Sequence, residues 1–121
     1  MKNQESVENY LERILMLSLD GKKARSVDIA LEMNFTRASV SVAMKKLRAS
    51  GYVDIEPGGF IILTEEGKKI AEIIYERHVI LRDWLVSLGV EPKTALNDAC
   101  AIEHVISKQS FEAMRDYIKK I

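Results

Sequence analysis

One short segment near the C-terminus gathers side chains that could bind a metal ion. The segment D-A-C-A-I-E-H-V-I-S, residues 98–107, holds Cys100, the only cysteine, and His104, one of two histidines, with Glu103 between them. In a helix, residues three and four apart share a face, so a thiol, a carboxylate and an imidazole would lie together. Such a set could coordinate a divalent transition metal, with Cys100 giving a thiolate sulfur or a main-chain oxygen.

Three other residues could add ligands to such a site. His78 falls on the apolar stripe of a helix predicted over residues 64–88, and Asn9 and Glu12 share a face of a predicted N-terminal helix. Each residue alone has an ordinary explanation, because inward histidines often bond a carbonyl and single cysteines are usually small buried hydrophobes. A C-x-x-E-H set together with an inward histidine favours the metal site.

Hydrophobic periodicity and turn residues predict a mainly α chain with one small β-hairpin. Five predicted helices cover residues 6–20, 37–50, 64–88, 92–107 and 110–121, and a further short helix is predicted after Ser26. Ser26 and Thr36 are the predicted caps of the short helix and of the helix over 37–50. Two β-rich runs, at 52–56 and 60–64, flank P-G-G. The G-K-K-A-R segment, residues 21–25, is predicted to be a basic turn. Helix, short helix, turn, longer helix and hairpin is the order of a winged helix-turn-helix.

The predicted helix over residues 37–50 has the pattern of a DNA-reading helix. Val40, Ala43, Met44 and Leu47 form its inward stripe, and the opposite face is basic and hydroxylated. A solvated amphipathic helix would show the same pattern, but the hairpin that follows favours DNA binding. The residues predicted to contact DNA are Ser26, Thr36, Arg37, Ala38, Ser39, Ser41, Val42, Lys45, Lys46 and Arg48.

Composition is that of a soluble globular protein. The 121 residues are 47% hydrophobic and 30% charged, with a formal net charge of zero. Residues 21–64 nevertheless hold seven Lys and Arg against four Asp and Glu, a local excess that suits phosphate binding. The chain has no apolar run that could cross a membrane, and its single cysteine fits a reducing cytoplasm.

Several segments in order resemble the diphtheria-toxin-repressor family of metal-activated transcription regulators, which includes the manganese transport regulators. They are Y-L-E-R-I, S-V-D-I-A, A-S-V-S-V-A-M-K-K-L, I-L-T-E-E-G-K-K-I-A, E-R-H and A-C-A-I-E-H-V-I-S. The resemblance covers nearly the whole chain. It implies a winged-helix DNA-binding domain over residues 1–64 and a helical metal-binding and dimerisation domain over 65–121, as in short members without an SH3-like third domain.

The resemblance also implies a ligand set and a metal. The family's metal-site positions match Asn9, Glu12, His78, Cys100, Glu103 and His104. Cys100 stands where manganese-type members usually have glutamate and iron-type members cysteine, which favours Fe(II) over Mn(II); Zn(II) and Co(II) should also bind in vitro. Asn9 matches neither type. Arg82 occupies a position where the family often has another glutamate ligand, so we expect one well-formed site.

The sequence therefore predicts a cytoplasmic homodimer that binds a double-stranded DNA operator when a divalent cation is bound. We expect a repressor of iron or manganese uptake genes, and not an enzyme. Two alternatives are a winged-helix regulator that senses a non-metal ligand and a DNA-binding module held folded by a structural zinc. A hydrolytic enzyme with Cys100 as nucleophile and His104 as base would also need an oxyanion hole, which the sequence does not indicate.

Overall fold

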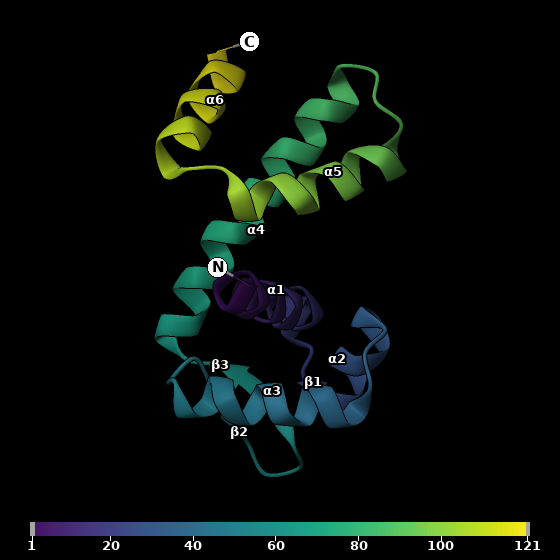
Figure 1. Cartoon of the computed structure of the whole chain (residues 1–121), viewed down its shortest axis with the longest axis vertical. Helices are drawn as coiled ribbons and strands as arrows, with labels where there is room; N and C mark the ends of the chain where they lie inside the picture. Colours follow the sequence, from purple (N-terminus) through teal and green to yellow (C-terminus); the bar gives the residue numbers. More distant parts are fainter. Residues whose placement is uncertain (1, 121) are drawn as a thin grey trace. The chain divides into compact units, whose positions relative to one another are not determined.

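The computed structural model describes the backbone of residues 2–120 and the side chains of residues 5–120. The chain forms two compact units, of which the first runs to Glu72 and the second begins at Ile73 (Figure 1). The division falls within the long helix α4, Glu65–Ser87. Each unit has its own hydrophobic core, so the two are described in turn.

The first helix, α1, spans Lys2–Leu17 and buries one face in the core of the first unit. Leu11 and Ile14, which are three residues apart and so share a face of the helix, are completely buried. The predicted end at Asp20 is three residues too late, because a 3₁₀ turn at Leu19–Gly21 follows the helix and Asp20 adopts a φ of 63°.

A three-stranded antiparallel sheet forms the wing. The predicted hairpin is confirmed as β2, Val53–Ile55, and β3, Phe60–Leu63, around the P-G-G turn. β1, Ala24–Arg25, pairs with the other edge of β3, giving the order β1-β3-β2. The predicted basic turn over residues 21–25 is therefore wrong at its last two residues, since a strand of two residues is too short to show periodicity.

The helix-turn-helix consists of α2, Ser26–Met33, and α3, Arg37–Ala49. Asn34 ends α2 in the left-handed conformation with a φ of 58°, as asparagine commonly does. Thr36 is the N-cap of α3, as predicted, because its Oγ1 accepts a hydrogen bond of 3.1 Å from the Ser39 main-chain nitrogen.

The start of α2 differs from the prediction by one residue. Ser26 is the first helical residue and Arg25 is the N-cap. The Arg25 main-chain nitrogen donates a 2.8 Å hydrogen bond to Asp28 Oδ2, so an aspartate at the third helical position reaches back to the N-cap main chain, as in one half of a capping box. The predicted cap at Ser26 is therefore wrong.

The start of α4 is held tightly against the hairpin. Thr64 precedes the helix, and its Oγ1 accepts from the Gly67 main-chain nitrogen at 3.2 Å and donates to the Gly51 carbonyl at 2.6 Å. A Cβ on Gly67 would lie 2.1 Å from the Tyr52 carbonyl oxygen, closer than any non-bonded contact allows. The glycine therefore permits the close approach of helix and strand.

The second unit contains the rest of α4 with α5, Pro92–Val105, and α6, Lys108–Lys120. The predicted ends were within about three residues for all three helices, and the predicted last residue, Ile121, lies outside the described residues. Its small core consists of Leu81, Ala99 and Phe111, with partly buried neighbours that include Ile102 and Met114.

The architecture is mainly α with a small β wing, which confirms the predicted fold class. Among the described residues, the first-unit core collects twelve buried residues from all of its α-helices and strands, including Val40, Met44 and Leu47 of the predicted inward stripe of α3, while Ala43 is partly buried. Among the described residues, no helix combines the length and the apolarity needed to cross a bilayer.

Candidate metal centre and nucleic-acid interface

His78 lies on the buried face of α4, as the periodicity predicts. Ile74 before it and Leu81 after it are each 2% exposed, and His78 itself is 3% exposed. The apolar neighbours keep the imidazole out of solvent, so its ring nitrogens need partners within the protein. α5 provides them.

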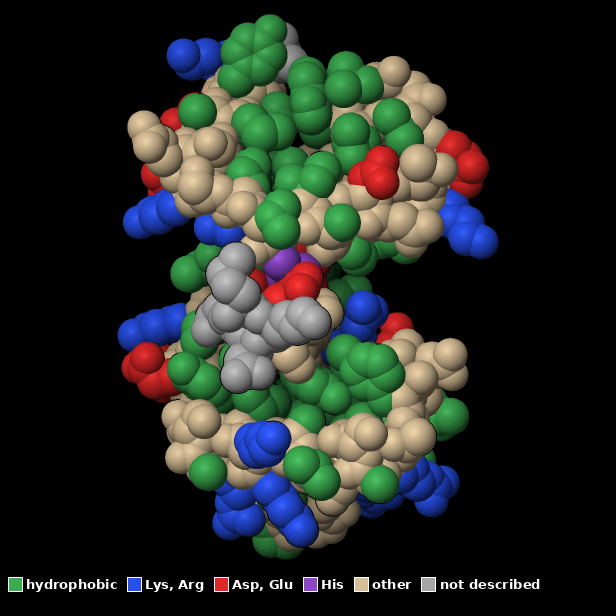
Figure 2. Space-filling view, viewed as in Figure 1, with side chains coloured by type: hydrophobic (Ala, Val, Ile, Leu, Met, Phe, Trp, Pro, Cys, Tyr) green, Lys and Arg blue, Asp and Glu red, His purple; other side chains and the backbone are tan. Residues whose placement is uncertain are grey.

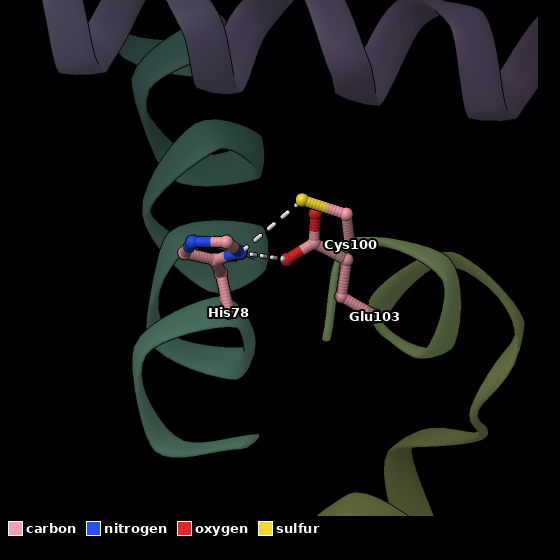
Figure 3. Close-up of side chains that lie close together, drawn as sticks. All are labelled: His78, Cys100 and Glu103. Carbon is pink, nitrogen blue, oxygen red and sulfur yellow. Dashed lines mark hydrogen bonds and ion pairs between the residues drawn. The ribbon is translucent and has the colours of Figure 1, made fainter. Parts of the chain in front are cut away.

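Cys100 and Glu103 project from one face of α5 toward His78 (Figure 3). The His78 Nδ1 atom lies 3.7 Å from Cys100 Sγ and 3.2 Å from Glu103 Oε2. Their spacing of three residues along α5 puts thiol and carboxyl side by side, as the sequence predicts. One donor atom from each of the three residues lies within 4.8 Å of the others.

His104 lies on the other side of the same carboxylate. Its Nε2 atom is 3.4 Å from Glu103 Oε1. The two oxygens of Glu103 therefore face two different imidazoles, one from α4 and one from the next residue of α5. The sequence predicts a single shared face for Cys100, Glu103 and His104. In the structure, His78 and His104 lie at different oxygens of the Glu103 carboxylate, and Cys100 lies beside His78.

The surroundings of His78 favour positive charge. The polar contacts with Cys100 and then with Glu103 raise the pKa of the His78 imidazole to about 10, while burial acts in the opposite direction. Glu103 is completely buried, and neither of its oxygens makes a hydrogen bond of good geometry with any described residue. A buried carboxylate is costly unless a cation compensates it, so this position suits a proton on His78 or a metal ion.

The donor set fits a divalent transition metal. It combines a thiol sulfur, an imidazole nitrogen and a carboxylate oxygen, whose mixture of soft and hard atoms is typical of first-row metals rather than Ca²⁺ or Mg²⁺. The His78 Nε2 atom is also buried without a hydrogen-bond partner among the described residues. The apolar surroundings and closely grouped ligand atoms are consistent with a metal centre.

The remaining predicted ligands lie on α1. Asn9 is partly buried and Glu12 is 3% exposed, and both belong to the first unit. Arg82, predicted to disfavour a second cation, lies one turn after His78 on α4. Its Nε pairs with Asp83 Oδ1 at 3.0 Å.

The residues predicted to contact DNA lie on or beside an exposed face of the first unit. All those on α3 and its cap are exposed, whereas Ser26 is partly buried. Thr36 and Ser39 also bond to each other, with a distance of 2.8 Å between their hydroxyl oxygens. Figure 2 shows Lys and Arg side chains at the edge of this unit. Val42, 53% exposed, adds an apolar contact surface among the polar groups.

The wing is attached to the helix-turn-helix through Arg25, which sequence reasoning missed. Its Nε donates a 2.9 Å hydrogen bond to the Gly58 carbonyl, and its guanidinium lies 4.4 Å from the centre of the Phe60 ring. Lys23 forms a 2.9 Å ion pair with Glu56 on the same hairpin. Arg25 in β1 and Lys23 just before it thus hold the turn between β2 and β3.

Arg77 was also missed, although it precedes His78 directly. Its Nη1 atom lies 3.2 Å from each of two main-chain carbonyl oxygens, those of Glu103 and Ile106. Both partners are main-chain groups more than twenty residues away in sequence, and neither leaves a signal in side-chain periodicity.

Two family models match consecutive parts of the chain. The iron dependent repressor N-terminal DNA binding domain matches residues 3–59. The iron dependent repressor metal binding and dimerisation domain matches residues 64–121. Their order is the order of the winged-helix unit and the helical unit described above.

Relatives match over nearly the full chain. The transcriptional regulator MntR of Escherichia coli is 33% identical over 117 residues, covering 97% of this chain and 76% of that protein. An HTH-type transcriptional regulator of Methanocaldococcus jannaschii is 35% identical over 118 residues, covering 96% and 94% respectively.

Among solved structures, the manganese regulator SloR superposes with a TM-score of 0.81 at 25% sequence identity. The match covers 93% of this chain and 53% of that one, so the present chain spans about half the length of that structure. The sequence resemblance and the predicted absence of enzymatic function are thereby confirmed. The chain belongs to the iron-dependent repressor family, also called the diphtheria-toxin-repressor family, whose members are metal-dependent transcriptional regulators and not enzymes.

Proposed function

We propose that this chain is a DNA-binding repressor activated by one divalent metal ion at a site that includes His78, Cys100 and Glu103. The observation that carries the proposal is the buried grouping of imidazole, thiol and carboxylate within 4.8 Å of one another. Bound there, the ion would supply the positive charge that the buried carboxylate requires and directed bonds to all three side chains.

We assign the two roles to the two predicted domains, with DNA binding in residues 1–64 and metal binding and dimerisation in residues 65–121. The matches of the two family models support this assignment. We place the regulator in the cytoplasm, where its DNA target and a reducing environment for Cys100 are found.

We also propose Asn9, Glu12 and His104 as ligands. The case for Asn9 and Glu12 rests on the sequence resemblance and on their shared face of α1. His104 is supported by the 3.4 Å distance from its Nε2 to Glu103 Oε1. Arg82 supports a single ion, because a guanidinium one turn from His78 opposes a second cation nearby.

Fe(II) is the proposed corepressor, with Mn(II) as its main competitor. A thiolate is a soft ligand and favours Fe(II) over the harder Mn(II). SloR, by contrast, is described as a manganese regulator, which is why Mn(II) is kept as the competitor. Zn(II) and Co(II) should bind in vitro because the stability order favours both over Fe(II) and Mn(II).

The exposed face of α3 is proposed to read the DNA. Arg37, Ser41, Lys45 and Arg48 supply charge and hydrogen-bond donors, and Ala38, Ser39 and Val42 allow close approach to base edges. Thr36, Lys46 and Ser26, together with Arg37 in the first turn of α3, would contact the phosphate backbone of the DNA. The target would be an uptake-gene operator with two half-sites roughly 34–36 Å apart.

The homodimer is proposed to form through apolar side chains of the second unit. Figure 2 shows hydrophobic side chains at the surface of this unit, and Val86 and Tyr117 are 41% and 62% exposed. Trp84 packs edge-on against Tyr117, with ring centres 6.5 Å apart, which gives α4 and α6 a continuous aromatic surface. Burying such a surface against a second copy would favour association.

Metal and DNA binding must be linked in both directions. If metal raises the affinity for the operator by some factor, operator DNA raises the affinity for metal by the same factor. The coupling can therefore be measured either as the effect of metal on operator affinity or as the effect of operator DNA on metal affinity.

The decisive experiment is operator binding with and without metal. Operator DNA would be selected from a randomised library under anaerobic conditions with Fe(II), and its affinity measured by fluorescence anisotropy with Fe(II), Mn(II) or chelator. We expect binding at least ten times tighter with Fe(II) than with chelator, a coupling of about 1.4 kcal/mol. Equal affinity with metal and chelator would reject metal activation.

The same samples separate the other interpretations. A structural zinc predicts that chelator unfolds the protein, which circular dichroism would detect, whereas the proposed switch leaves the helices intact. A regulator of a non-metal ligand predicts a protein that binds DNA without any response to metal.

A further inference from the structure

Two adjacent residues of α4 hold Glu103 in different ways. His78 contacts its carboxylate, with Nδ1 3.2 Å from Oε2. Arg77 contacts its main chain, with Nη1 3.2 Å from the carbonyl oxygen. His78 therefore fixes the position of the Glu103 carboxylate, and Arg77 fixes the position of the Glu103 main chain.

The same guanidinium nitrogen also reaches past the end of α5. α5 ends at Val105, and Nη1 of Arg77 lies 3.2 Å from the carbonyl of Ile106, the C-cap residue. The last carbonyls of a helix have no partners within it and carry partial negative charge, so a cationic donor there is favourable. Arg77 thus satisfies two carbonyls on either side of the helix terminus.

Arg77 also contacts the beginning of α6. Its guanidinium carbon lies 5.5 Å from the centre of the Phe111 ring, and Phe111 is 3% exposed in the core of the second unit. The side chain is therefore partly buried and confined by three elements: α4, which carries it, the end of α5, and α6. A long side chain held at this many points has little freedom to move.

We infer that Arg77 is a positioning residue for the metal site, a role that rests on the proposed function. By fixing the main chain at Glu103, it holds the carboxylate opposite His78 and beside Cys100. Without its two hydrogen bonds, the end of α5 could shift along α4 and separate the ligand atoms. Residues that orient metal ligands typically change metal affinity by about 10–100-fold when replaced.

Arg77 could instead only stabilise the fold, and a matched control distinguishes the two roles. Ser107 caps α6, because its Oγ accepts a 3.0 Å hydrogen bond from the Ser110 main-chain nitrogen. It belongs to the same α5–α6 junction but bonds α6 rather than Glu103. Ser107→Ala should therefore weaken the junction, and lower the unfolding temperature, without moving the ligands.

The experiment uses Co(II) as a spectroscopic probe of the whole chain. Wild type, Arg77→Met, Arg77→Lys and Ser107→Ala would be titrated with Co(II) while the visible ligand-field bands and the thiolate charge-transfer band of Cys100 are recorded. Thermal unfolding of each metal-free protein gives its stability independently. Methionine keeps the apolar stem but no donor, and lysine keeps the charge but not the planar fork.

We expect Arg77→Met to bind Co(II) about tenfold more weakly and with shifted bands, and Arg77→Lys to fall between it and wild type at about threefold. Ser107→Ala should lower the unfolding temperature but keep wild-type affinity and bands. Wild-type binding and spectrum in Arg77→Met, or an equal loss in Ser107→Ala, would overturn the inference.

Two further outcomes are informative. If Arg77→Met does not fold, Arg77→Lys decides, and wild-type affinity in that variant would overturn the inference. If wild type itself shows no thiolate band with Co(II), the metal site is rejected and the role of Arg77 with it, whereas a wild-type band that Arg77 variants leave unchanged rejects only the role of Arg77.

Discussion

In the first unit, α3 exposes Arg37, Ser41 and Lys45 to solvent, whereas in the second unit α4 and α5 bury His78 and Glu103. The exposed side chains are accessible to an external partner. The buried residues contact one another at 3.2 Å and depend on each other for compensation of charge. The polar residues of α3 are therefore available to a partner molecule, whereas those of α4 and α5 compensate one another inside the protein.

This contrast predicts how each region responds to substitution. Exposed contacts with DNA should contribute separately and in modest amounts. Buried ligands should act as a group, because removing one leaves the others in an apolar setting without compensation. The predictions below test that difference, beginning with the buried group.

Replacing the central carboxylate should have the largest effect. Glu103→Ala removes an oxygen ligand and the partner of two imidazoles, so we expect at least a 100-fold loss of Co(II) affinity, about 2.7 kcal/mol. Isothermal titration calorimetry measures it. Asp98→Ala, an exposed carboxylate on the same helix, is the matched control and should bind normally. Equal affinity in Glu103→Ala and Asp98→Ala would exclude Glu103 as a ligand.

A methyl group at the start of α4 should destabilise the first unit without touching any ligand. Gly67→Ala brings a Cβ into the Tyr52 carbonyl, and we expect it to lower the free energy of unfolding by about 2 kcal/mol. Urea unfolding followed by circular dichroism measures the change. Lys68→Ala, an exposed neighbour, should change stability by less than about 0.5 kcal/mol. A Gly67→Ala protein as stable as Lys68→Ala would show that helix and strand are not in such close contact.

Removing one exposed charge from α3 should have a smaller and salt-dependent effect. Arg37→Ala should weaken operator binding about tenfold and lower the slope of log K against log salt by about one, because one phosphate contact is lost. Anisotropy titrations over a salt series measure both. Lys93→Ala, an exposed charge on α5, serves as the control. An unchanged salt slope in Arg37→Ala would remove Arg37 from the phosphate-contacting face.

Metal removal should give the smallest change, concentrated at α5, which carries the proposed ligands Cys100, Glu103 and His104. At a free metal concentration three times Kd, amides that exchange by opening of α5 should be protected about fourfold relative to protein in chelator. Amides of α3, in the separate core of the first unit, should exchange at the same rate in both samples. Hydrogen-exchange mass spectrometry resolves the two helices. Equal protection of α5 and α3, or of neither, would contradict an effect of metal that is concentrated at these ligands.

Much of the fold follows from local sequence chemistry. Thr36 was predicted as a helix cap, and its hydroxyl accepts the expected main-chain hydrogen bond. Val40, Met44 and Leu47 were predicted to face inward and are all buried. The P-G-G hairpin also formed as expected. In each case the signal lies within a few neighbouring residues, where turn geometry and helical periodicity act directly.

Features that depend on distant main-chain groups were not predictable in this way. β1 exists because Ala24 and Arg25 pair with β3 more than thirty residues later, and two residues show no alternation. The hydrogen bonds from Arg77 to the carbonyls of Glu103 and Ile106 also join groups that are far apart in the sequence. Leu88, the last residue of the long helix predicted over 64–88, is 60% exposed, because α4 ends at Ser87.

The candidate site was predictable as a set of residues but not as an arrangement. Helical spacing placed Cys100, Glu103 and His104 on one face, and the inward stripe of the long helix included His78. The structure places the His78 imidazole 3.7 Å from Cys100 Sγ and shows that His104 faces the other carboxylate oxygen of Glu103. That division depends on how α4 packs against α5, which the spacing within either helix does not determine.

X-ray absorption spectroscopy at the iron edge of the anaerobically Fe(II)-loaded protein tests the central claim most directly. The account predicts one sulfur scatterer from Cys100 in addition to nitrogen and oxygen ligands, and loss of that sulfur in Cys100→Ser while the remaining ligands stay. A ligand shell of nitrogen and oxygen alone in the wild-type protein would contradict the claim that Cys100 joins His78 and Glu103 around the metal.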